Sequence, residues 1–533
     1  MPSELQLQSE REVCREIVRR FLLDPEEAQR VEQTKLDIAK KYGLNGIPRN
    51  SDILAVTSVG ERRVLLERLR LKRVRGISGV HVIGVMSSPE RCPHGRCAYC
   101  PQEHDAPTSY TGYEPAAMRA RQHDFDPCAQ LSSRLAQLRA IGHRVSKVEI
   151  VVQGGTFLAR PVKYQRNFVK RCFDALNEEE SISLEEAKSR AESSKIRNVG
   201  LTFETRPDWA RERHVDLMLS FGGTRVEIGV QSLDDDVLTL VGRGHSTQDV
   251  VESFRVAKDA GLKAVAHMMP GLPGSTAETD LHGFKRLVSD PEFRPDMLKI
   301  YPCLVVRGTM IRDWWSAGTY TPLSTEDAAH LIANVKEFIP PWMRIMRIQR
   351  EIPARLILAG PNKGNLREDA LVLLGKRGRR CRCIRCREVG HRRMKENIEP
   401  VVREVRLTRT SYESSEGTEF FLSREDLVTD TLIAYLRLRI PSPYAHRKEV
   451  RSRRCSVVRE LHVCGPVVPI GEHDSDSWQH KGHGISLLEE AERVSREECD
   501  ITKILVLSAL GTKRYYANAG YKPDGPYVSK ELN

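Results

Sequence analysis

HVIGVMSSPERCPHGRCAYCP, residues 81–101, is the most informative segment of this 533-residue chain. Its first six residues are mostly apolar and rich in β-branched types, which is typical of a buried strand. Three cysteines follow, Cys92, Cys97 and Cys100, with the spacing C-x4-C-x2-C. Thiolates so close together can converge on one metal centre. We therefore expect a metal-binding loop directly after a strand.

Further β-rich runs alternate with helical patterns up to about residue 352. They cover residues 147–152, 198–204, 225–231, 263–269, 297–306 and 343–349. Repeated βα units imply a parallel sheet, and this number of units favours a full or partial TIM-type barrel. In such α/β folds the chemistry lies at the carboxyl ends of the strands, so we expect the site there.

The first cysteine cluster admits two kinds of metal. A structural zinc ion would require a fourth ligand, whereas an iron–sulfur cluster held by three cysteines keeps one iron without a protein ligand. That iron can chelate the amino and carboxylate groups of S-adenosylmethionine (SAM), and the reduced cluster can break a carbon–sulfur bond. Tyr99, directly before the last cysteine, fits a radical SAM loop. The structural zinc site stays open as the alternative.

Polar and glycine residues that suit SAM recur at or near the ends of the later β-runs. A bare glycine pair lets backbone carbonyls approach a ligand closely. Each residue alone is also typical of a structural role, such as a salt bridge or a turn. The residues predicted to bind the cofactor are Gly154, Gly155, Glu204, Glu227, Gln231 and Arg243.

The last 130 residues predict a small α+β domain. β-rich runs begin at residues 401, 418, 432, 455 and 503, and residues 485–498 have a helical pattern. Gln479, Gly482 and Gly484 form Q-x-x-G-x-G at the start of that helix, where bare backbone NH groups can cradle a pyrophosphate. A hydroxyl of Tyr515 or Tyr516 can protonate a leaving thiolate. Together these features indicate a GNAT-type acetyl-CoA domain, with a cofactor-free glycine turn as the alternative.

A second cysteine cluster lies between these two regions. Cys381, Cys383 and Cys386 are flanked by arginines, which lower thiol pKa values and so favour a zinc knot. His391 or a distant cysteine could be the fourth ligand, and free redox-sensitive thiols are the alternative. Nine Lys or Arg residues between 376 and 393 could grip phosphate.

Charge and hydropathy limit the class of protein. The chain carries 84 basic and 72 acidic residues, a net charge of +12, which favours an anionic partner such as nucleic acid. Residues 61–75 hold seven of these basic side chains beside a Val/Leu stripe, and solvation of a helix would also explain them. No membrane-length apolar run or secretory leader is present, which predicts a cytoplasmic protein without membrane contact. The predicted parts are a basic helical segment that could contact phosphate (1–76), a radical SAM domain (77–360), a cysteine-rich zinc linker (361–400) and a GNAT domain (401–533).

The sequence resembles the catalytic subunit of the Elongator complex, in its stand-alone form, over nearly its whole length. The resemblance runs from KKYGLNGIPRNSDIL (40–54) to GYKPDGPYVSKEL (520–532). Between these segments it is carried by CPHGRCAYCP, SYTGYEPAAMRA, GGTF, FETRPDW, RVEIGVQS, AHMMPGLPG, IYPCLVVRGT, NLRE and VRELHVCG.

This resemblance implies an enzyme that builds 5-carboxymethyluridine at the wobble position of tRNA. Acetyl-CoA would supply the two carbons and SAM the radical, with the tRNA anticodon stem–loop as substrate and no other Elongator subunits. It also implies a [4Fe-4S] cluster on Cys92, Cys97 and Cys100, and zinc on Cys381, Cys383 and Cys386. Lys147, Tyr515 and Tyr516 would be catalytic, and the further implied acetyl-CoA contacts are Glu460, Leu461, His462, Val463, His483, Gly484 and Ile485.

Two other functions remain open, as does a homodimer. The chain could be a protein lysine acetyltransferase with a structural iron–sulfur domain, in which Glu460 deprotonates the amine. It could also be a non-catalytic RNA-binding module, which would show a steep salt dependence and neither cofactor. Cys464, His483 and ANAGY (517–521) depart from the residues usual in the family, which predicts weaker acetyl-CoA binding.

Overall fold

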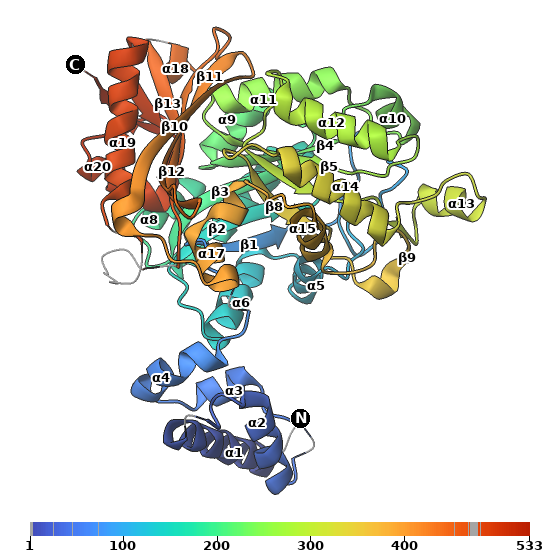
Figure 1. Ribbon diagram of the computed structural model, residues 1–533, viewed down its shortest axis with the longest axis vertical. Helices are drawn as coiled ribbons and strands as arrows, with labels where there is room; N and C mark the ends of the chain where they lie inside the picture. The colour runs from blue at the N-terminus through green and yellow to red at the C-terminus, as the bar shows by residue number, and fades with distance from the viewer. Residues whose placement is uncertain are drawn as a thin grey trace.

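The computed structural model describes residues 4–24, 26–44, 46–72, 74–451, 454–466, 468, 478–479 and 481–532 (Figure 1). A helical N-terminal lobe, a barrel-like parallel sheet, a cysteine-rich connection and a mixed C-terminal sheet follow one another along the chain. Within these ranges, no helix combines the length and apolar character needed to cross a bilayer.

The N-terminal lobe is a cluster of four helices around its own small core. Val13, Ile17, Ile38, Ile53 and Leu65 are fully or almost fully buried in it. The lobe projects from the rest of the molecule and meets it at α6 (Pro127–Ala140), against which α3 packs (Figure 1). The four helices are α1 (Glu4–Leu23), α2 (Val31–Lys41), α3 (Asn50–Ala55) and α4 (Val59–Leu69).

The middle of the chain forms the predicted partial barrel. Seven strands pair in parallel in the order β1-β2-β3-β4-β5-β6-β8. They are β1 (His81–Met86), β2 (Lys147–Gln153), β3 (Arg197–Thr205), β4 (Arg225–Gln231), β5 (Lys263–Met268), β6 (Met297–Ile300) and β8 (Arg344–Ile348). The helices around the sheet are α5 (Pro115–Gln122), α6, α7 (Val162–Asn177), α8 (Leu184–Ala191), α9 (Glu212–Ser220), α10 (Asp235–Leu240), α11 (Thr247–Asp259), α12 (Ala277–Ser289), α13 (Met310–Ser316), α14 (Thr325–Phe338) and α15 (Leu366–Lys376).

One predicted strand of the barrel was wrong. The run 297–306 is two strands, because Pro302 has no backbone N–H to continue the ladder. β6 ends at Ile300, and β7 (Val305–Val306) pairs with β9 (Ile357–Ala359) in a separate two-stranded sheet.

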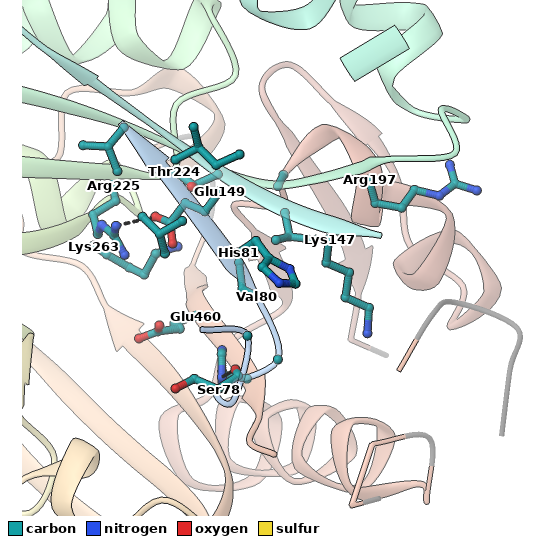
Figure 2. Close-up of a pocket in the computed structure, with 18 of the residues that line it drawn as sticks. Ser78, Val80, His81, Lys147, Glu149, Arg197, Thr224, Arg225, Lys263 and Glu460 are labelled. Atoms are coloured by element: carbon teal, nitrogen blue, oxygen red, sulfur yellow. Dashed lines mark hydrogen bonds and ion pairs between the residues drawn. The ribbon is translucent and has the colours of Figure 1, made fainter. Parts of the chain in front are cut away.

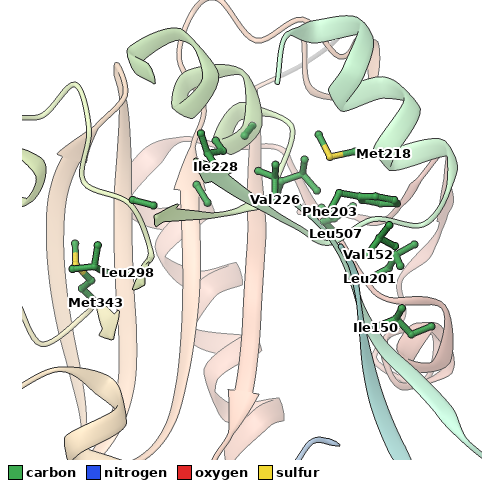
Figure 3. Close-up of a cluster of buried hydrophobic side chains, with 14 of the residues drawn as sticks. Ile150, Val152, Leu201, Phe203, Met218, Val226, Ile228, Leu298, Met343 and Leu507 are labelled. Carbon is green, nitrogen blue, oxygen red and sulfur yellow. The ribbon is translucent and has the colours of Figure 1, made fainter. Parts of the chain in front are cut away.

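Alternation along the barrel strands separates the core from the lumen. On β2, Ile150 and Val152 are fully buried and belong to the main apolar cluster, while Glu149 and Gln153 line a cavity. On β4, Val226 and Ile228 pack in the same cluster. Figure 3 shows this layer together with Met218 of α9. The strand period of two therefore leaves one face of the sheet for ligands.

The C-terminal part is a seven-stranded mixed sheet in the order β10-β11-β12-β13-β14-β16-β15. The strands are β10 (Val405–Ser414), β11 (Gly417–Asp426), β12 (Thr431–Ile440), β13 (Cys455–Val463), β14 (Lys503–Val506), β15 (Lys522–Asp524) and β16 (Tyr527–Glu531), with helices α18 (Lys448–Arg451), α19 (His483–Arg493) and α20 (Lys513–Asn518). The run predicted from residue 401 starts only at Val405, because residues 402–404 form a 3₁₀ turn. The helix predicted over 485–498 begins at His483 and widens into a π-helix over Val494–Glu498, where the Ser495 hydroxyl bonds Ser456 of β13.

Buried ion pairs fix the C-terminal sheet against the barrel. Arg459 of β13 bonds Asp296, directly before β6, at 2.8 Å. Arg439 of β12 bonds Asp259, at the end of α11, at 2.7 Å. All four side chains are buried. Asp259 and Asp296 precede β5 and β6, so the C-terminal sheet lies at the amino-terminal edge of the barrel.

Candidate active site

A single cavity of about 1580 Å³ lies between the barrel and the C-terminal sheet. Figure 2 shows side chains from the barrel strands and Glu460 of the C-terminal sheet around it. Residues from opposite ends of the sequence thus surround the same space. The lining residues that the sequence had singled out are Lys147, Glu227, Glu460, Leu461, His462, Val463, Gln479, Gly482, His483, Gly484, Ile485, Tyr515 and Tyr516.

The cavity opens at the amino ends of the barrel strands. His81, Lys147 and Lys263, the first residues of β1, β2 and β5, all line it. Gln153 at the carboxyl end of β2 and Lys299 within β6 also line it, so it extends along the lumen. The carboxyl ends, where the sequence predicts the barrel's chemistry, are thus connected through the lumen with the amino ends, which the C-terminal sheet covers.

Lys147 connects the two sides of the cavity. Its Nζ donates a hydrogen bond of 2.9 Å to the Gln479 side-chain oxygen, and Gln479 Nε2 donates to the Val463 carbonyl at 3.2 Å. Burial lowers the pKa of Lys147 to about 8. The start of β2 is thereby joined to the end of β13 through one glutamine.

β13 presents a backbone edge to this cavity. Residues 455–458 pair with β14, whereas Glu460–Val463 pair only with β12 among the described strands. α19 begins beside them, and its N-cap is Gly482 at φ +81°, which supplies no capping side chain. An open strand edge beside an uncapped helix start can hold an extended amide arm and a phosphate.

The two tyrosines differ in exposure. Tyr515 is 39% exposed and Tyr516 is 6% exposed, and their rings are 5.2 Å apart and nearly perpendicular. A Cβ at Gly484 would come within 2.6 Å of the Tyr515 hydroxyl, so a larger residue there would displace the Tyr515 ring. Burial raises the pKa of Tyr515 to about 12, which keeps its hydroxyl protonated and able to donate at neutral pH.

The cysteine loop lies at the carboxyl end of the barrel sheet. A Cβ at Gly155, after β2, would lie 3.6 Å from Cys92 Sγ. Cys97 Sγ lies 3.0 Å from His94 Nε2 and 3.8 Å from Arg243 Nη1. Hydrogen bonds from Cys100 and His94, and the charge of Arg243, hold the pKa of the Cys97 thiol well below its usual value.

The three sulfurs are near one another but do not form one compact group. Cys97 and Cys100 share a hydrogen bond, whereas the three sulfurs are not all within 4.8 Å of one another. Three cysteines on one loop are a donor set that can hold an iron–sulfur cluster and leave one iron without a protein ligand.

The predicted acidic residues lie in a polar layer of the lumen. Glu204 accepts a hydrogen bond of 2.8 Å from the Tyr110 hydroxyl. Glu227 is paired with Lys299 and lies 3.1 Å from His267 Nε2. Sequence reasoning missed Lys299 and His267. Each is a polar residue within an otherwise apolar strand, and that pattern is the signal by which they could have been found.

Comparison with known proteins agrees with this architecture. The ELP3 N-terminal domain family matches residues 10–77, the radical SAM superfamily residues 86–282, and the radical SAM C-terminal domain residues 295–372. The tRNA uridine(34) acetyltransferase of Methanocaldococcus infernus is 46% identical over 97% of this chain and 98% of its own. The chain belongs to the Elongator complex protein 3 family. Human Elongator complex protein 3 is 44% identical over 94% of this chain and 93% of its own.

A solved structure of the family also matches. The archaeal Methanocaldococcus infernus Elp3 with an N-terminal deletion of residues 1–46 superposes with a TM-score of 0.77. The superposition covers 86% of this chain and the whole of the archaeal chain, and the two sequences are 44% identical. The radical SAM superfamily assignment implies a [4Fe-4S] cluster and SAM, which the donor set of the cysteine loop fits.

The second cysteine cluster is a separate, more compact group. The sulfurs of Cys381, Cys383 and Cys386 all lie within 4.8 Å of one another. The Lys336 ammonium lies 3.4 Å from Cys381 Sγ and 3.8 Å from Cys386 Sγ. His391, one of the candidates for a fourth ligand, has its Nε2 3.0 Å from Glu388, and the group of three sulfurs does not include it.

Proposed function

We propose that this protein modifies the wobble uridine of tRNA, forming 5-carboxymethyluridine from acetyl-CoA by radical SAM chemistry. The observation that carries the proposal is the single cavity shared by the barrel lumen and the predicted acetyl-CoA residues. Two archaeal relatives named tRNA uridine(34) acetyltransferase, each 46% identical, support the substrate.

The carboxyl end of the barrel would hold the metal cofactor and SAM. Cys92, Cys97 and Cys100 would bind the [4Fe-4S] cluster, which with SAM supplies a radical that can abstract hydrogen from an acetyl methyl group. The bare turn after β2 supports close approach of the methionine end, because Gly154 at φ +126° leaves no room for a Cβ beside Ser87. The proposed SAM contacts are Gly154, Gly155, Glu204, Glu227, Gln231 and Arg243.

The amino end of the barrel would receive acetyl-CoA. The α19 N-terminus would bind the pyrophosphate, and the open edge of β13 would pair with the pantetheine arm. Lys147 would orient the acetyl group from the barrel side. When water adds to the thioester carbon and gives the carboxylate, the protonated Tyr515 hydroxyl would donate to the departing CoA thiolate. The proposed contacts are Lys147, Glu460, Leu461, His462, Val463, Gln479, Gly482, His483, Gly484, Ile485 and Tyr516.

This arrangement brings the two reactants from opposite edges of one sheet. Carbon 5 of uracil is not acidic and an acetyl methyl group is a poor nucleophile, so a polar route is unfavourable. A radical route explains why one chain would hold both cofactors. The cavity continuing from Lys147 to Gln153 and Lys299 supports a meeting point inside the lumen.

The environment of Glu460 argues against a lysine acetyltransferase. Its two oxygens accept hydrogen bonds from Arg437 Nε at 2.9 Å and from the Tyr435 hydroxyl at 3.1 Å. Burial raises the pKa of Glu460, but the charges of Arg437 and Lys263 lower it by more. The pKa of Glu460 therefore lies below its usual value. A carboxylate held in this way is a weak base for an incoming amine.

We also propose zinc on Cys381, Cys383 and Cys386, with the tRNA anticodon stem–loop as partner. The three converging thiols support one ion, and the Lys336 ammonium offsets their charge. The archaeal relatives, which match almost end to end, support action without other Elongator subunits.

The test is anaerobic incubation of the cluster-loaded protein with reductant, SAM, acetyl-CoA and unmodified tRNA. Nucleoside digestion and mass spectrometry should detect 5-carboxymethyluridine with the native protein. Cys97→Ala and Gly484→Leu should each abolish it, since they remove one cofactor site apiece. Absence of the nucleoside beside an active archaeal relative would refute the proposal, and SAM-independent lysine acetylation would favour the alternative.

A further inference from the structure

We propose that Arg75, Arg119 and Arg134 form a phosphate-binding subsite for the RNA backbone at the edge of the cavity. This inference rests on the proposed function and specifies where the substrate is held. The three side chains come from separate elements: the segment before β1, α5 and α6. All three line the cavity.

Arg119 is buried, Arg75 and Arg134 are half-buried, and none of the three has the acidic partner that Arg439 and Arg459 have. Arg119, only 8% exposed, donates to the Gly84 carbonyl, and its Nε has no hydrogen-bond partner. Arg134 bonds only the neutral Gln137 amide oxygen, at 2.9 Å. Throughout the described part of the chain, no carboxylate lies within 4.0 Å of any of the three guanidinium groups.

Buried arginines at the domain interface show the usual arrangement. Arg439 and Arg459 are both fully buried, and each contacts at least one carboxylate at 3.0 Å or closer. Burying a charge without a counterion is costly, so such pairing is the rule. Arg119 departs from this rule at a position open to a ligand, and the half-buried Arg75 and Arg134 add positive charge to the same cavity.

The local electrostatics agree with a missing anion. Burial and the like charges of Arg75 and Arg119 lower the pKa of Arg134 to about 10. Burial and the charge of Arg75 likewise lower the pKa of Arg119. Glu351 is the one carboxylate that acts on all three groups, so positive charge stays in excess. An anion with several oxygens would relieve this repulsion, and guanidinium groups bind phosphate oxygens two at a time.

Position favours the phosphates of RNA over those of CoA. The predicted pyrophosphate site at Gly482 belongs to the C-terminal domain and lies at the start of α19. The arginines instead belong to the side of the barrel that meets the N-terminal lobe, where Arg62 bonds the Arg139 carbonyl at 3.0 Å. Figure 1 shows α6 between this lobe and the barrel, with α19 on the C-terminal sheet. Lys72, after α4, also lines the cavity and adds to its positive charge.

The test compares Arg75→Gln, Arg134→Gln and the double variant with Arg139→Gln. Arg139 is the matched control, because it also lies on α6 but is paired with Glu178 at 3.0 Å. Binding of an anticodon stem–loop RNA with an unmodified wobble uridine is measured over a range of salt concentrations. Acetyl-CoA binding and thermal unfolding are measured on the same variants.

We expect each of the two single variants to bind the RNA roughly tenfold more weakly than the control. The plot of log affinity against log salt should become shallower by about 0.7 for each RNA phosphate that the variant no longer neutralises. Acetyl-CoA affinity should not change. The melting temperature of the RNA-free protein should stay equal or rise, because an unpaired charge has been removed.

Unchanged RNA affinity and salt dependence would overturn the subsite. So would a lower melting temperature, which would make the arginines structural, or weaker acetyl-CoA binding instead, which would assign them to CoA. If the variants behave like the native protein while tRNA is still modified, only the subsite fails. If the native protein binds no RNA at all, the proposed function fails with it.

Discussion

Lys147 and Gln479 are 332 positions apart in the sequence, and the Lys147 ammonium donates a 2.9 Å hydrogen bond to the Gln479 side-chain oxygen. The space around this bond is tight, because a Cβ at Gly79 would lie 2.3 Å from Gln479 Nε2. The bond joins the amino end of β2 to the segment before α19. It therefore couples the barrel to the residues proposed to bind acetyl-CoA.

Acetyl-CoA affinity should fall as pH rises through about 8. Burial lowers the pKa of Lys147 to about 8, so the ammonium is present below that pH and is lost above it. If the ammonium orients the acetyl group, the dissociation constant should approach a tenfold increase for each pH unit above about 8. Isothermal titration calorimetry across this range measures the effect.

Lys147→Arg is the control for this pH dependence, because arginine keeps its charge throughout the range. Its affinity for acetyl-CoA should be lower than that of the native protein but flat with pH. A native curve that is equally flat would show that the Lys147 charge has no part in binding.

Replacing Cys97 by alanine should abolish the cluster and leave the other site intact. Cys97 is 1% exposed and its sulfur faces His94 and Arg243, so no solvent ligand easily replaces it. The anaerobically reconstituted variant should lack the visible absorption of a [4Fe-4S] cluster and should form no 5′-deoxyadenosine from SAM. Acetyl-CoA and RNA affinities should change less than about twofold.

Cys128→Ala is the matched control for that variant, since Cys128 is a partly buried cysteine on α6 outside both clusters. It should keep full iron content. Equal iron content in Cys97→Ala would remove the assignment of this loop to the cluster.

The barrel could be predicted because its signals are local. Each strand is a short apolar run, and the period of two on β2 and β4 already separates Ile150 and Val226 from Glu149 and Glu227. The errors occurred where local signals conflict. Pro302 interrupts an apolar run that otherwise continues through Val305 and Val306, and hydropathy alone does not register the break.

The site could be predicted only in separate pieces. Motif spacing identified Cys92, Cys97 and Cys100, and the glycines at the start of α19, because each set is close in sequence. The contact of Lys147 with Gln479 and the pairing of Glu227 with Lys299 depend on tertiary packing, which leaves no pattern in the sequence. The 3.0 Å contact between the His391 ring nitrogen and Glu388 could not be predicted for the same reason.

Loss of the second cysteine cluster should affect stability more than chemistry. Cys381, Cys383 and Cys386 converge beside the buried Lys336, so Cys383→Ser should remove about one zinc ion per chain, as measured by elemental analysis. The free thiols and the Lys336 charge would then stay buried without a metal, and the melting temperature should fall by several degrees. A native protein that contains no zinc, with Cys383→Ser equally stable, would contradict the proposed ion.

Breaking the interface ion pair should separate the two halves of the cavity. Arg459 contacts Asp296 at 2.8 Å and Glu419 at 3.0 Å, and all three side chains are buried. Arg459→Met leaves two buried carboxylates without this cation, so the free energy of unfolding should fall by about 3–5 kcal/mol in urea titrations.

Product formation should fall further than either SAM cleavage or acetyl-CoA binding alone, because each site keeps its own residues while their alignment is lost. The double variant Arg459→Met, Asp296→Asn should regain part of the stability, since Asp296 then no longer carries a charge that only Arg437, at 3.6 Å, still faces among the interface arginines. If product formation falls only in proportion to SAM cleavage, the Arg459 network supports folding alone and does not align the two sites.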